Sequence, residues 1–190
     1  MTPRLVHLNG PPGIGKSTVA QRYVEGRPGT LNLDIDRLRS FVGGWREHFG
    51  DTGEIVRPLA LGMARTHLLG GRDVILPQFL GRTSEIERFA EVAGTSGADF
   101  VEVMLTDSRE NCVARFDRRG EQDSDEWHHL VRGLVADNGG TALLEAMYGQ
   151  LTDVLRARPW VSIVVSAEGE IDNAHRALAR LLAPSANPTG

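Results

Sequence analysis

The most constraining feature of this sequence is a glycine-rich segment between an apolar run and a helix-forming run. Residues 4–9 form the apolar run RLVHLN, and residues 10–17, GPPGIGKS, match the pattern G-x-x-x-x-G-K-[ST] in full. Glycines in such a segment adopt backbone angles that a Cβ forbids, so the chain can wrap around a phosphate group. The sequence therefore predicts a strand–loop–helix unit that binds a nucleotide.

Most positions in this segment carry a predicted contact to the nucleotide. Pro11 and Pro12 lack an N–H group, so the amides that hold the phosphates must come mainly from residues 13–18. We expect these amides to open a helix, because the N-terminus of a helix favours an anion. The expected nucleotide-binding residues are Gly10, Gly13, Ile14, Gly15, Lys16, Ser17 and Thr18.

Lys16 and Ser17 have predicted roles in the chemistry as well as in binding. Lys16 is the only lysine among the 21 basic residues, which indicates a position that needs a compact ammonium and has no room for a guanidinium. We expect Lys16 to reach the β- and γ-phosphates as a catalytic residue, and the hydroxyl of Ser17 to bind Mg²⁺. The sequence thus predicts ATP and Mg²⁺ as the bound groups.

Composition and charge exclude several classes of protein. The chain has 190 residues and a formal net charge of −4, which disfavours binding to long nucleic acids and to anionic membranes. One cysteine excludes a disulfide framework, and no apolar run reaches the ~18–20 residues of a membrane span. We expect a cytoplasmic protein with one domain over residues 1–183 and a disordered tail over residues 184–190. The oligomeric state stays open.

Strand-like and helix-like segments alternate along the chain. The predicted strands cover residues 4–9, 30–33, 73–79, 100–105 and 161–165. The predicted helices cover residues 18–25, 37–41, 54–69, 83–93, 108–119, 125–136, 141–157 and 171–182, and a polar break is expected at 120–124. This alternation predicts an α/β fold, a three-layer sandwich with a parallel sheet and helices on both faces.

An acidic pair, Asp34-Ile-Asp36, follows the second predicted strand. A GTPase would need an Asn-Lys-x-Asp element, which this chain lacks because its one lysine is Lys16. The third predicted strand ends in Leu76-Pro77-Gln78, where a motor ATPase would carry an acid, so another carboxylate must serve the metal. Residues two apart on a strand point the same way, so we expect both carboxylates to face one site. One would hold Mg²⁺ through water while the other orients an acceptor hydroxyl. The alternative interpretation is that an aspartate only caps the helix that begins near Arg37.

With these motifs the sequence resembles the small P-loop kinase group. The resemblance rests on residues 10–17, on Asp34-Ile-Asp36-Arg37-Leu38 and on a later arginine segment. Members of this group include shikimate kinase, gluconate kinase, chloramphenicol phosphotransferase and the zeta-toxin kinases. The resemblance implies a five-stranded sheet of order 2-3-1-4-5 with a lid, and phosphorylation of a small hydroxyl compound by ATP·Mg²⁺. It also implies that Asp34 is the metal-side acid and that Asp36 is the substrate-side acid and candidate catalytic base.

Three arginines near the end of the fifth predicted helix form a second group of candidates. Arg115, Arg118 and Arg119 are spaced i, i+3, i+4 and would share one helix face. In the resembling kinases this segment, about residues 118–130, is the lid whose arginines close over the phosphates. Arg115 and Arg119 are therefore candidate catalytic residues and Arg118 is a candidate nucleotide-binding residue. The alternative interpretation is a solvated basic face.

Two further arginines are candidates for the acceptor pocket beside Asp36. Arg39, one turn beyond Asp36, is expected to bind an acidic substrate group or to form a salt bridge. Arg82 lies in a Gly81-Arg82-Thr83 stretch similar to that of the zeta toxins and is expected to bind the γ-phosphate or the substrate; the alternative is an ordinary arginine before a helix. Other candidate lining residues are Trp45, His48, Phe49, Gln78 and Trp127.

These observations favour one function and leave two alternatives open. The favoured hypothesis is an ATP-dependent phosphotransferase that acts on a hydroxyl of a small molecule such as an antibiotic, a sugar or a cyclitol. The first alternative is a nucleoside monophosphate or polynucleotide-end kinase. The second is a non-catalytic module that binds a nucleotide without transferring phosphate.

Overall fold

Five parallel strands form the centre of the computed structural model, which describes residues 2–122 and 126–183; of residues 119–122 and 126–128 only the backbone is described. The sheet has the order β2-β3-β1-β4-β5, which confirms the predicted order. The strands are β1 (Arg4–Asn9), β2 (Leu31–Asn32), β3 (Val74–Leu76), β4 (Asp99–Thr106) and β5 (Ser162–Val165). Parallel strands are usually connected by a helix, and here helices pack on both faces of the sheet.

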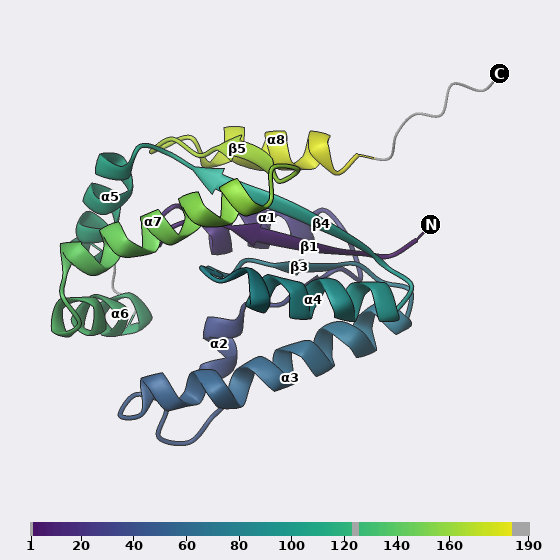
Figure 1. Cartoon of the computed structure of the whole chain (residues 1–190), viewed down its shortest axis with the longest axis horizontal. Coiled ribbons are helices and arrows are strands. Elements are labelled where there is room, and N and C mark those ends of the chain that lie inside the picture. The colour runs from purple at the N-terminus through teal and green to yellow at the C-terminus, as the bar shows by residue number, and fades with distance from the viewer. Residues whose placement is uncertain (1, 123–125, 184–190) are drawn as a thin grey trace.

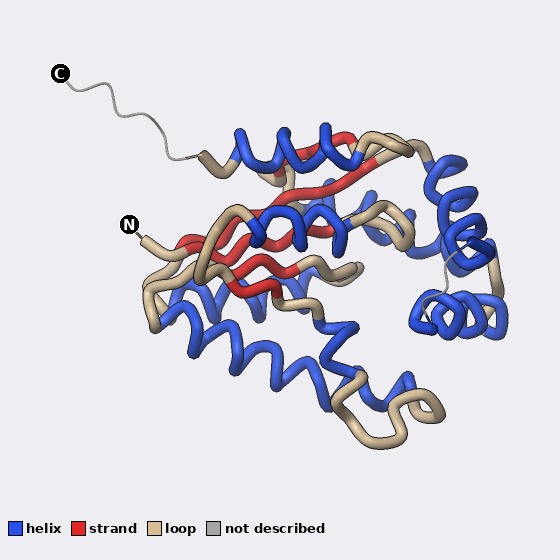
Figure 2. Tube along the Cα trace, turned by 180° about the vertical axis from the view of Figure 1, so that it is seen from behind, coloured by secondary structure: helices blue, strands red, loops and turns tan. Residues whose placement is uncertain are grey.

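Helices flank the sheet and also gather beyond one of its ends. They are α1 (Lys16–Glu25), α2 (Ile35–Arg39), α3 (Phe49–Leu69), α4 (Thr83–Thr95), α5 (Arg109–Gln122), α6 (Glu126–Asp137), α7 (Thr141–Ala157) and α8 (Ile171–Leu181). Figure 1 shows α5 and α6 beyond the carboxyl ends of the strands. In Figure 2, seen from behind, the same two helices, in blue, lie apart from the strands, in red. In open α/β sheets the carboxyl ends are where ligands bind.

The sheet separates two hydrophobic clusters, which makes the predicted three-layer sandwich. Along β1, Val6 and Leu8 pack toward α1 and α8, whereas Leu5 packs toward α3, α4 and the second half of α7. The central strand β3 is buried on both faces, which explains why its sequence, VIL, is wholly apolar. Among the helices of the described residues, none is both long and apolar enough to cross a bilayer.

Several predicted boundaries are wrong, and packing explains the largest error. Helix α3 begins at Phe49 and not near residue 54, despite glycines at positions 50 and 53. Gly53 is buried, and a Cβ there would lie 3.2 Å from the Arg39 guanidinium. The hydroxyl of Thr52 donates to the Phe49 carbonyl and accepts from Arg39. These tertiary contacts outweigh the low helix propensity of glycine. Helix α5 likewise extends to Gln122, past the start of the break predicted over residues 120–124.

Strand β2 is shorter than predicted, and this changes the geometry of the acidic pair. The strand ends at Asn32, so Asp34 and Asp36 do not alternate along a strand as expected. Asp34 is the N-cap of α2, and its Oδ1 accepts a hydrogen bond of 3.1 Å from the backbone N–H of Asp36. Asp34 therefore caps α2, and its predicted role toward the metal stays a prediction; Asp36 lies in the first turn of the helix.

His7 is a buried polar residue in the middle of β1 with a specific partner. Its Nε2 lies 3.0 Å from the carbonyl oxygen of Gln78, and its ring stacks on Phe100 at a centroid distance of 6.4 Å. A neutral imidazole with its proton on Nε2 donates this hydrogen bond. Burial lowers the pKa of His7 from 6.5 to about 4. The residue thus ties β1 to the segment after β3.

Because the folded-state pKa of His7 is depressed, its contribution to stability should depend on pH. In the unfolded chain His7 takes up a proton below about pH 6.5, whereas in the folded chain it does so only near pH 4. The contribution of His7 to the free energy of unfolding is therefore fully present above pH 6.5 and decreases by about 3 kcal/mol as the pH falls to 4. Urea unfolding of the His7→Phe variant between pH 7 and 4 should show a flatter profile than the wild type. The exposed His48→Phe change should leave the profile unaltered, and an unaltered profile for His7→Phe would contradict this account.

Candidate active site

The loop over residues 10–15, here called the glycine loop, joins β1 to α1 in a conformation that requires glycine. Gly13 has φ 79° and Gly15 has φ 95°, both in the left-handed region. A Cβ on Gly15 would lie 2.6 Å from Cδ1 of Ile171 in α8. The loop is therefore fixed both by its own backbone angles and by the helices around it.

The first turn of α1 presents its N–H groups to the end of the sheet. No side chain caps this helix N-terminus within the described part of the chain, and the first-turn amides of residues 16–18 have no acceptor inside the helix. The Ser17 side chain is exposed at this point. Lys16 Nζ lies 2.8 Å from the Gly10 carbonyl oxygen and 2.9 Å from that of Pro11. Amides, a hydroxyl and an ammonium in this arrangement fit an anionic group such as a phosphate chain.

Asn9, which the sequence analysis did not single out, clamps the start of the glycine loop. Its Oδ1 accepts from the backbone N–H groups of Gly10 at 2.9 Å and of Leu80 at 3.2 Å. Its Nδ2 donates to the Leu80 carbonyl at 2.9 Å. The buried side chain therefore holds together the carboxyl ends of β1 and β3, the two strands that border the site. A buried asparagine between two strand ends is the sequence signal that could have indicated this role.

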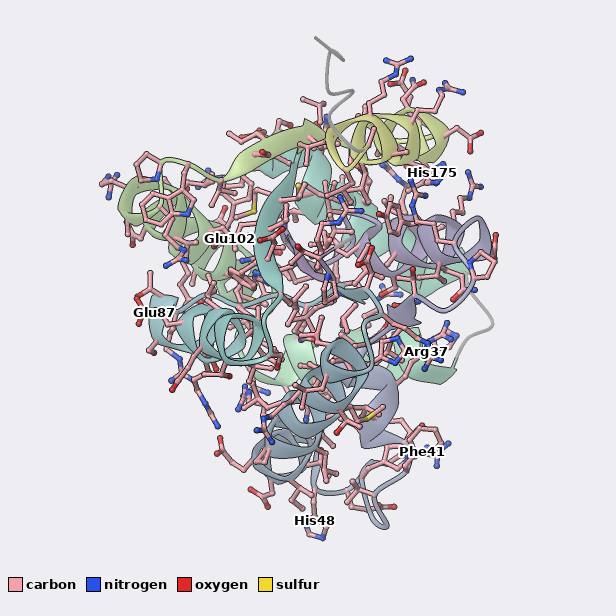
Figure 3. The ribbon with its side chains drawn as sticks, turned by 90° about the vertical axis from the view of Figure 1, so that its right-hand side faces the viewer. Arg37, Phe41, His48, Glu87, Glu102 and His175 are labelled. Atoms are coloured by element: carbon pink, nitrogen blue, oxygen red, sulfur yellow. The ribbon has the colours of Figure 1, made fainter. Side chains whose placement is uncertain are left out.

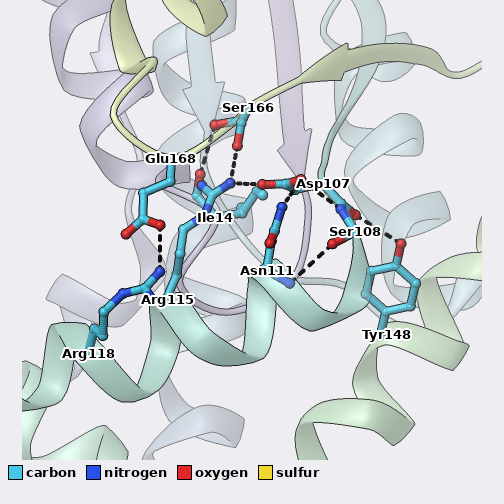
Figure 4. A network of polar contacts seen from close by, with 9 residues as sticks. All are labelled: Ile14, Asp107, Ser108, Asn111, Arg115, Arg118, Tyr148, Ser166 and Glu168. Atoms are coloured by element: carbon cyan, nitrogen blue, oxygen red, sulfur yellow. Dashed lines mark hydrogen bonds and ion pairs between the residues drawn. The ribbon is translucent and has the colours of Figure 1, made fainter.

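A buried polar network holds the other side of the loop (Figure 4). The Arg115 guanidinium donates to the Asp107 carboxylate and to the Ser166 carbonyl. The hydroxyl of Ser166 donates to the Ile14 carbonyl at 3.0 Å. This chain of contacts links α5 and the ends of β4 and β5 to the glycine loop. Arg115 therefore supports the loop in this structure, and its predicted action on the phosphates stays a prediction.

Asp107 is the charged centre of this network. Partial burial alone would raise its pKa, but hydrogen bonds from the Asn111 amide, the Ser108 N–H and the Arg115 guanidinium hold the pKa of Asp107 below its usual range. The Tyr148 hydroxyl donates to the Asp107 backbone carbonyl at 3.0 Å and so ties α7 to the same point. Asp107 is thus ionised at neutral pH and fixes Arg115.

Asp36 is placed on the opposite side of the glycine loop by α2 and α3. Its Oδ1 lies 3.5 Å from Nε of Arg39. The Arg39 guanidinium in turn donates to the Phe49 carbonyl at 2.6 Å and to the Thr52 hydroxyl at 3.0 Å. Burial and the Asp34 carboxylate raise the pKa of Asp36, against the opposing effects of Arg39 and Lys16. A carboxylate with a raised pKa is a better proton acceptor than an ordinary aspartate.

A cavity of about 450 Å³, here called the central cleft, brings these groups together. It is bordered by the glycine loop, by α2 and the start of α3, by the segment after β3, and by α5, α6 and α7. The lining residues are Pro12, Gly13, Gly15, Lys16, Ser17, Asp36, Arg39, Phe49, Gly50, Pro77, Gln78, Phe79, Phe116, Val131, Arg132, Leu134, Val135, Asn138, Leu143 and Met147. Lys16, Ser17 and Asp36 therefore share one cavity, as the sequence analysis expected.

Other predicted residues lie outside the cleft lining. Four of them do not line the cleft although they are near it in the sequence: Gly10, Ile14, Thr18 and Asp34. The side chains of Ile14 and Asp34 are buried. Arg82 is exposed and pairs with Glu85 at 2.8 Å, which fits the alternative of an ordinary arginine before a helix. Arg118 pairs with Glu168 at the surface. The Arg119 side chain lies outside the described residues, as does part of the predicted lid over residues 118–130.

The other candidate lining residues divide in the same way. Phe49 and Gln78 line the cleft, and the buried Oε1 of Gln78 has no hydrogen-bond partner among the described residues. His48 is exposed, and Figure 3 shows it at the outer edge of the molecule beside the start of α3. Trp45 is not a lining residue, and the Trp127 side chain is outside the description.

Sequence reasoning missed the far wall of the cleft. Arg132, Val131, Leu134 and Val135 come from α6, and Leu143 and Met147 come from α7. The spacing of Val131, Leu134 and Val135 at i, i+3 and i+4 was the available signal, because it marks an apolar helix face. Within the described residues, Arg39 and Arg132 are the arginines whose side chains line the cleft.

The cleft fits a divalent cation only together with a phosphate ligand. No group of three or more His, Cys, Asp or Glu residues capable of holding a metal occurs in the described part of the chain. Mg²⁺ keeps several waters and binds through one or two protein groups plus substrate phosphates. The Ser17 hydroxyl, beside the first-turn amides of α1, could supply one such protein ligand.

The strand order, the glycine loop after β1 and the acid after β2 define a P-loop kinase-like protein. The family model described as AAA domain (AAA_33) matches residues 5–133. This chain belongs to that family.

Solved structures of other proteins share this fold. A gluconokinase from Sinorhizobium meliloti 1021 has a TM-score of 0.61 and 20% identity, and the match covers 95% of this chain and 94% of that chain. A tunicamycin resistance protein from Deinococcus radiodurans has a TM-score of 0.60 and 18% identity, with coverage of 98% and 99%. At these identities the likeness concerns the fold. A comparison with curated proteins finds no match.

The contact between the buried Arg115 guanidinium and the partly buried Asp107 carboxylate predicts a stability cost when one partner is removed. Arg115→Leu removes the charged partner of Asp107 and should lower the free energy of unfolding by about 1.5–3 kcal/mol in urea titrations. Asp107→Asn, which keeps the shape of the side chain, should act in the same direction. The control is Arg156→Leu, which removes an exposed ion pair with Asp153 and should cost less than about 1 kcal/mol. Equal losses for Arg115→Leu and Arg156→Leu would refute the structural role of the network.

Proposed function

We propose that this protein is an ATP-dependent phosphotransferase that transfers the γ-phosphoryl group of ATP·Mg²⁺ to a hydroxyl of a small molecule. The observation that carries this proposal is the central cleft, in which the ammonium of Lys16, the hydroxyl of Ser17 and the carboxylate of Asp36 face the same cavity. Phosphoryl transfer depends mainly on positioning and charge stabilisation, and this set supplies both. Sugars, cyclitols and hydroxyl-bearing antibiotics, the acceptor classes considered from the sequence, all carry such a hydroxyl.

The glycine loop and the start of α1 form the donor side of the proposed site. ATP supplies the phosphoryl group when bound, and Mg²⁺ neutralises part of its charge. The first-turn amides of α1 hold the phosphate chain, and Lys16 exchanges its contacts with the Gly10 and Pro11 carbonyls for phosphate oxygens. Ser17 would bind the metal through its hydroxyl, and Asp34 stays a candidate to hold it through water. Asn9 and Ser166 keep the loop in place during the reaction.

Asp36 forms the acceptor side. It accepts a hydrogen bond from the acceptor hydroxyl and so aims the oxygen at the γ-phosphorus. As the new O–P bond forms, the bond to the leaving ADP breaks and the hydroxyl proton passes to the Asp36 carboxylate. The raised pKa of Asp36 assists this proton transfer. Arg39 keeps the carboxylate in position from 3.5 Å.

Arginines complete the proposed charge stabilisation. Arg132 from α6 lines the cleft and is a candidate to stabilise charge on the transferring group. Arg115, Arg118 and Arg119 stay candidates for the phosphate side, and Arg82 stays a candidate for substrate binding. The need for ATP as phosphoryl donor makes the cytoplasm the expected location, and the acidic net charge of −4 favours a small substrate over a long nucleic acid.

Replacement of Asp36 tests the assignment of the acceptor side. Asp36→Asn keeps the shape of the side chain but cannot take the proton, so turnover should fall by about 10²–10⁴-fold. Calorimetric affinity for ATP·Mg²⁺ should stay within a few-fold of the wild type, because Asp36 does not bind the phosphates. The control is Asp153→Asn at an exposed position, which should leave both quantities unchanged. Wild-type turnover in Asp36→Asn would remove Asp36 from the chemistry.

A further inference from the structure

We infer that the acceptor is an amphipathic alcohol, in which the reacting hydroxyl is attached to a predominantly apolar body. The body would bind to the apolar wall of the central cleft, which consists of Phe116, Val131, Leu134, Val135, Leu143 and Met147. This inference rests on the proposed function, and it narrows the acceptor to a class that the sequence analysis did not distinguish.

The central cleft has two chemically different sides. The side near the glycine loop carries Lys16, Ser17 and Asp36, the groups that the proposed reaction uses. A second part of the lining is the apolar wall, contributed by three consecutive helices, α5, α6 and α7, and it begins beside the glycine loop, where Phe116 lies against Gly13. A ligand that fills the cleft therefore meets polar groups at Lys16, Ser17 and Asp36 and apolar side chains along the wall. A phosphoryl group and one hydroxyl occupy only the first side.

The apolar wall is not part of the folded core. None of its residues belongs to either of the two hydrophobic clusters that the sheet separates. Val131, Leu134 and Val135 are half-buried and lie on one face of α6, and this face lines the cleft. A packed helix normally buries its apolar face against the protein, so a face that lines a cavity instead indicates a ligand that completes its burial.

A strongly polar acceptor would be poorly matched to this wall. The polar side chains in the same part of the lining, among the described residues, are those of Arg132 and Asn138, with Gln78 across the cavity. A polyhydroxylated acceptor would bring several hydroxyl groups against Val131, Leu134 and Leu143, where they would lose their hydrogen bonds to water without replacement. An apolar body suffers no such loss. The volume of about 450 Å³ is sufficient for a drug-sized molecule.

Matched pairs of alcohols test this inference in the full chain. Each member of a pair carries one primary hydroxyl and only the body differs: 1-octanol against 2-(2-ethoxyethoxy)ethanol, and 3-phenyl-1-propanol against 3-methoxy-1-propanol. Calorimetric binding in the presence of ADP·Mg²⁺ should favour the apolar member by at least about tenfold in each pair, and Leu134→Asn should reduce this ratio to about threefold or less. Val135→Thr, which keeps the side-chain shape, should lower the ratio in the same direction.

The controls separate this inference from the proposed function. Leu59→Asn, at an exposed position on α3, should leave the binding ratio unchanged. Affinity for ATP·Mg²⁺ should be unchanged in all three variants. Equal binding of the two members, no binding of either, or an unchanged ratio in Leu134→Asn would overturn the amphipathic acceptor. The proposed function is judged separately by acceptor-stimulated release of ADP: a bound alcohol that is never phosphorylated would contradict the transfer and leave the binding result standing.

Discussion

The conformation of the loop between β1 and α1 is the constraint on which the rest of this structure depends. Left-handed glycines turn the chain so that the first amides of α1 point to the end of the sheet. Two buried contacts fix this turn from outside: the Asn9 side chain ties it to the segment after β3, and the Ser166 hydroxyl ties it to the end of β5. The loop therefore owes its shape to groups far away in the sequence, and its amides are oriented before any ligand binds. Such preorganisation lowers the reorganisation cost of binding a charged group.

The groups around the loop divide into those that hold it and those that face the cavity. The buried Arg115 and its partner Asp107 hold it, while Asp36 reaches the central cleft from α2. Asp34 and Arg39 place Asp36 by capping α2 and by an ion pair. The cleft is then closed by α5, α6 and α7, which supply apolar side chains. One part of the cavity thus carries charged and polar side chains, and another part is lined by apolar ones.

The sequence predicted the parts of the site that depend on local chemistry. The glycine loop and the convergence of Lys16, Ser17 and Asp36 on one cavity followed from a short motif and a pair of acids, although Asp36 reaches that cavity from helix α2 and not from a strand. The strand order followed from the resemblance to small P-loop kinases. Residues whose role depends on tertiary contacts were missed or given other roles: Asn9 as a clamp, Arg115 as the partner of Asp107, and the apolar wall of α6 and α7. The start of α3 was misplaced for the same reason, because Gly53 and Thr52 are helical owing to their contacts with Arg39. Local propensity carries no information about such partners.

The central claim is that the glycine loop with Lys16 binds the phosphates of ATP. Calorimetric titration of the wild type and of Lys16→Arg with ATP·Mg²⁺ tests it most directly, because the arginine keeps the charge but not the compact ammonium. We expect the wild-type chain to bind one ATP and the affinity for ATP to be at least about tenfold weaker in Lys16→Arg. Absence of binding by the wild type, or equal affinities for the two proteins, would contradict it.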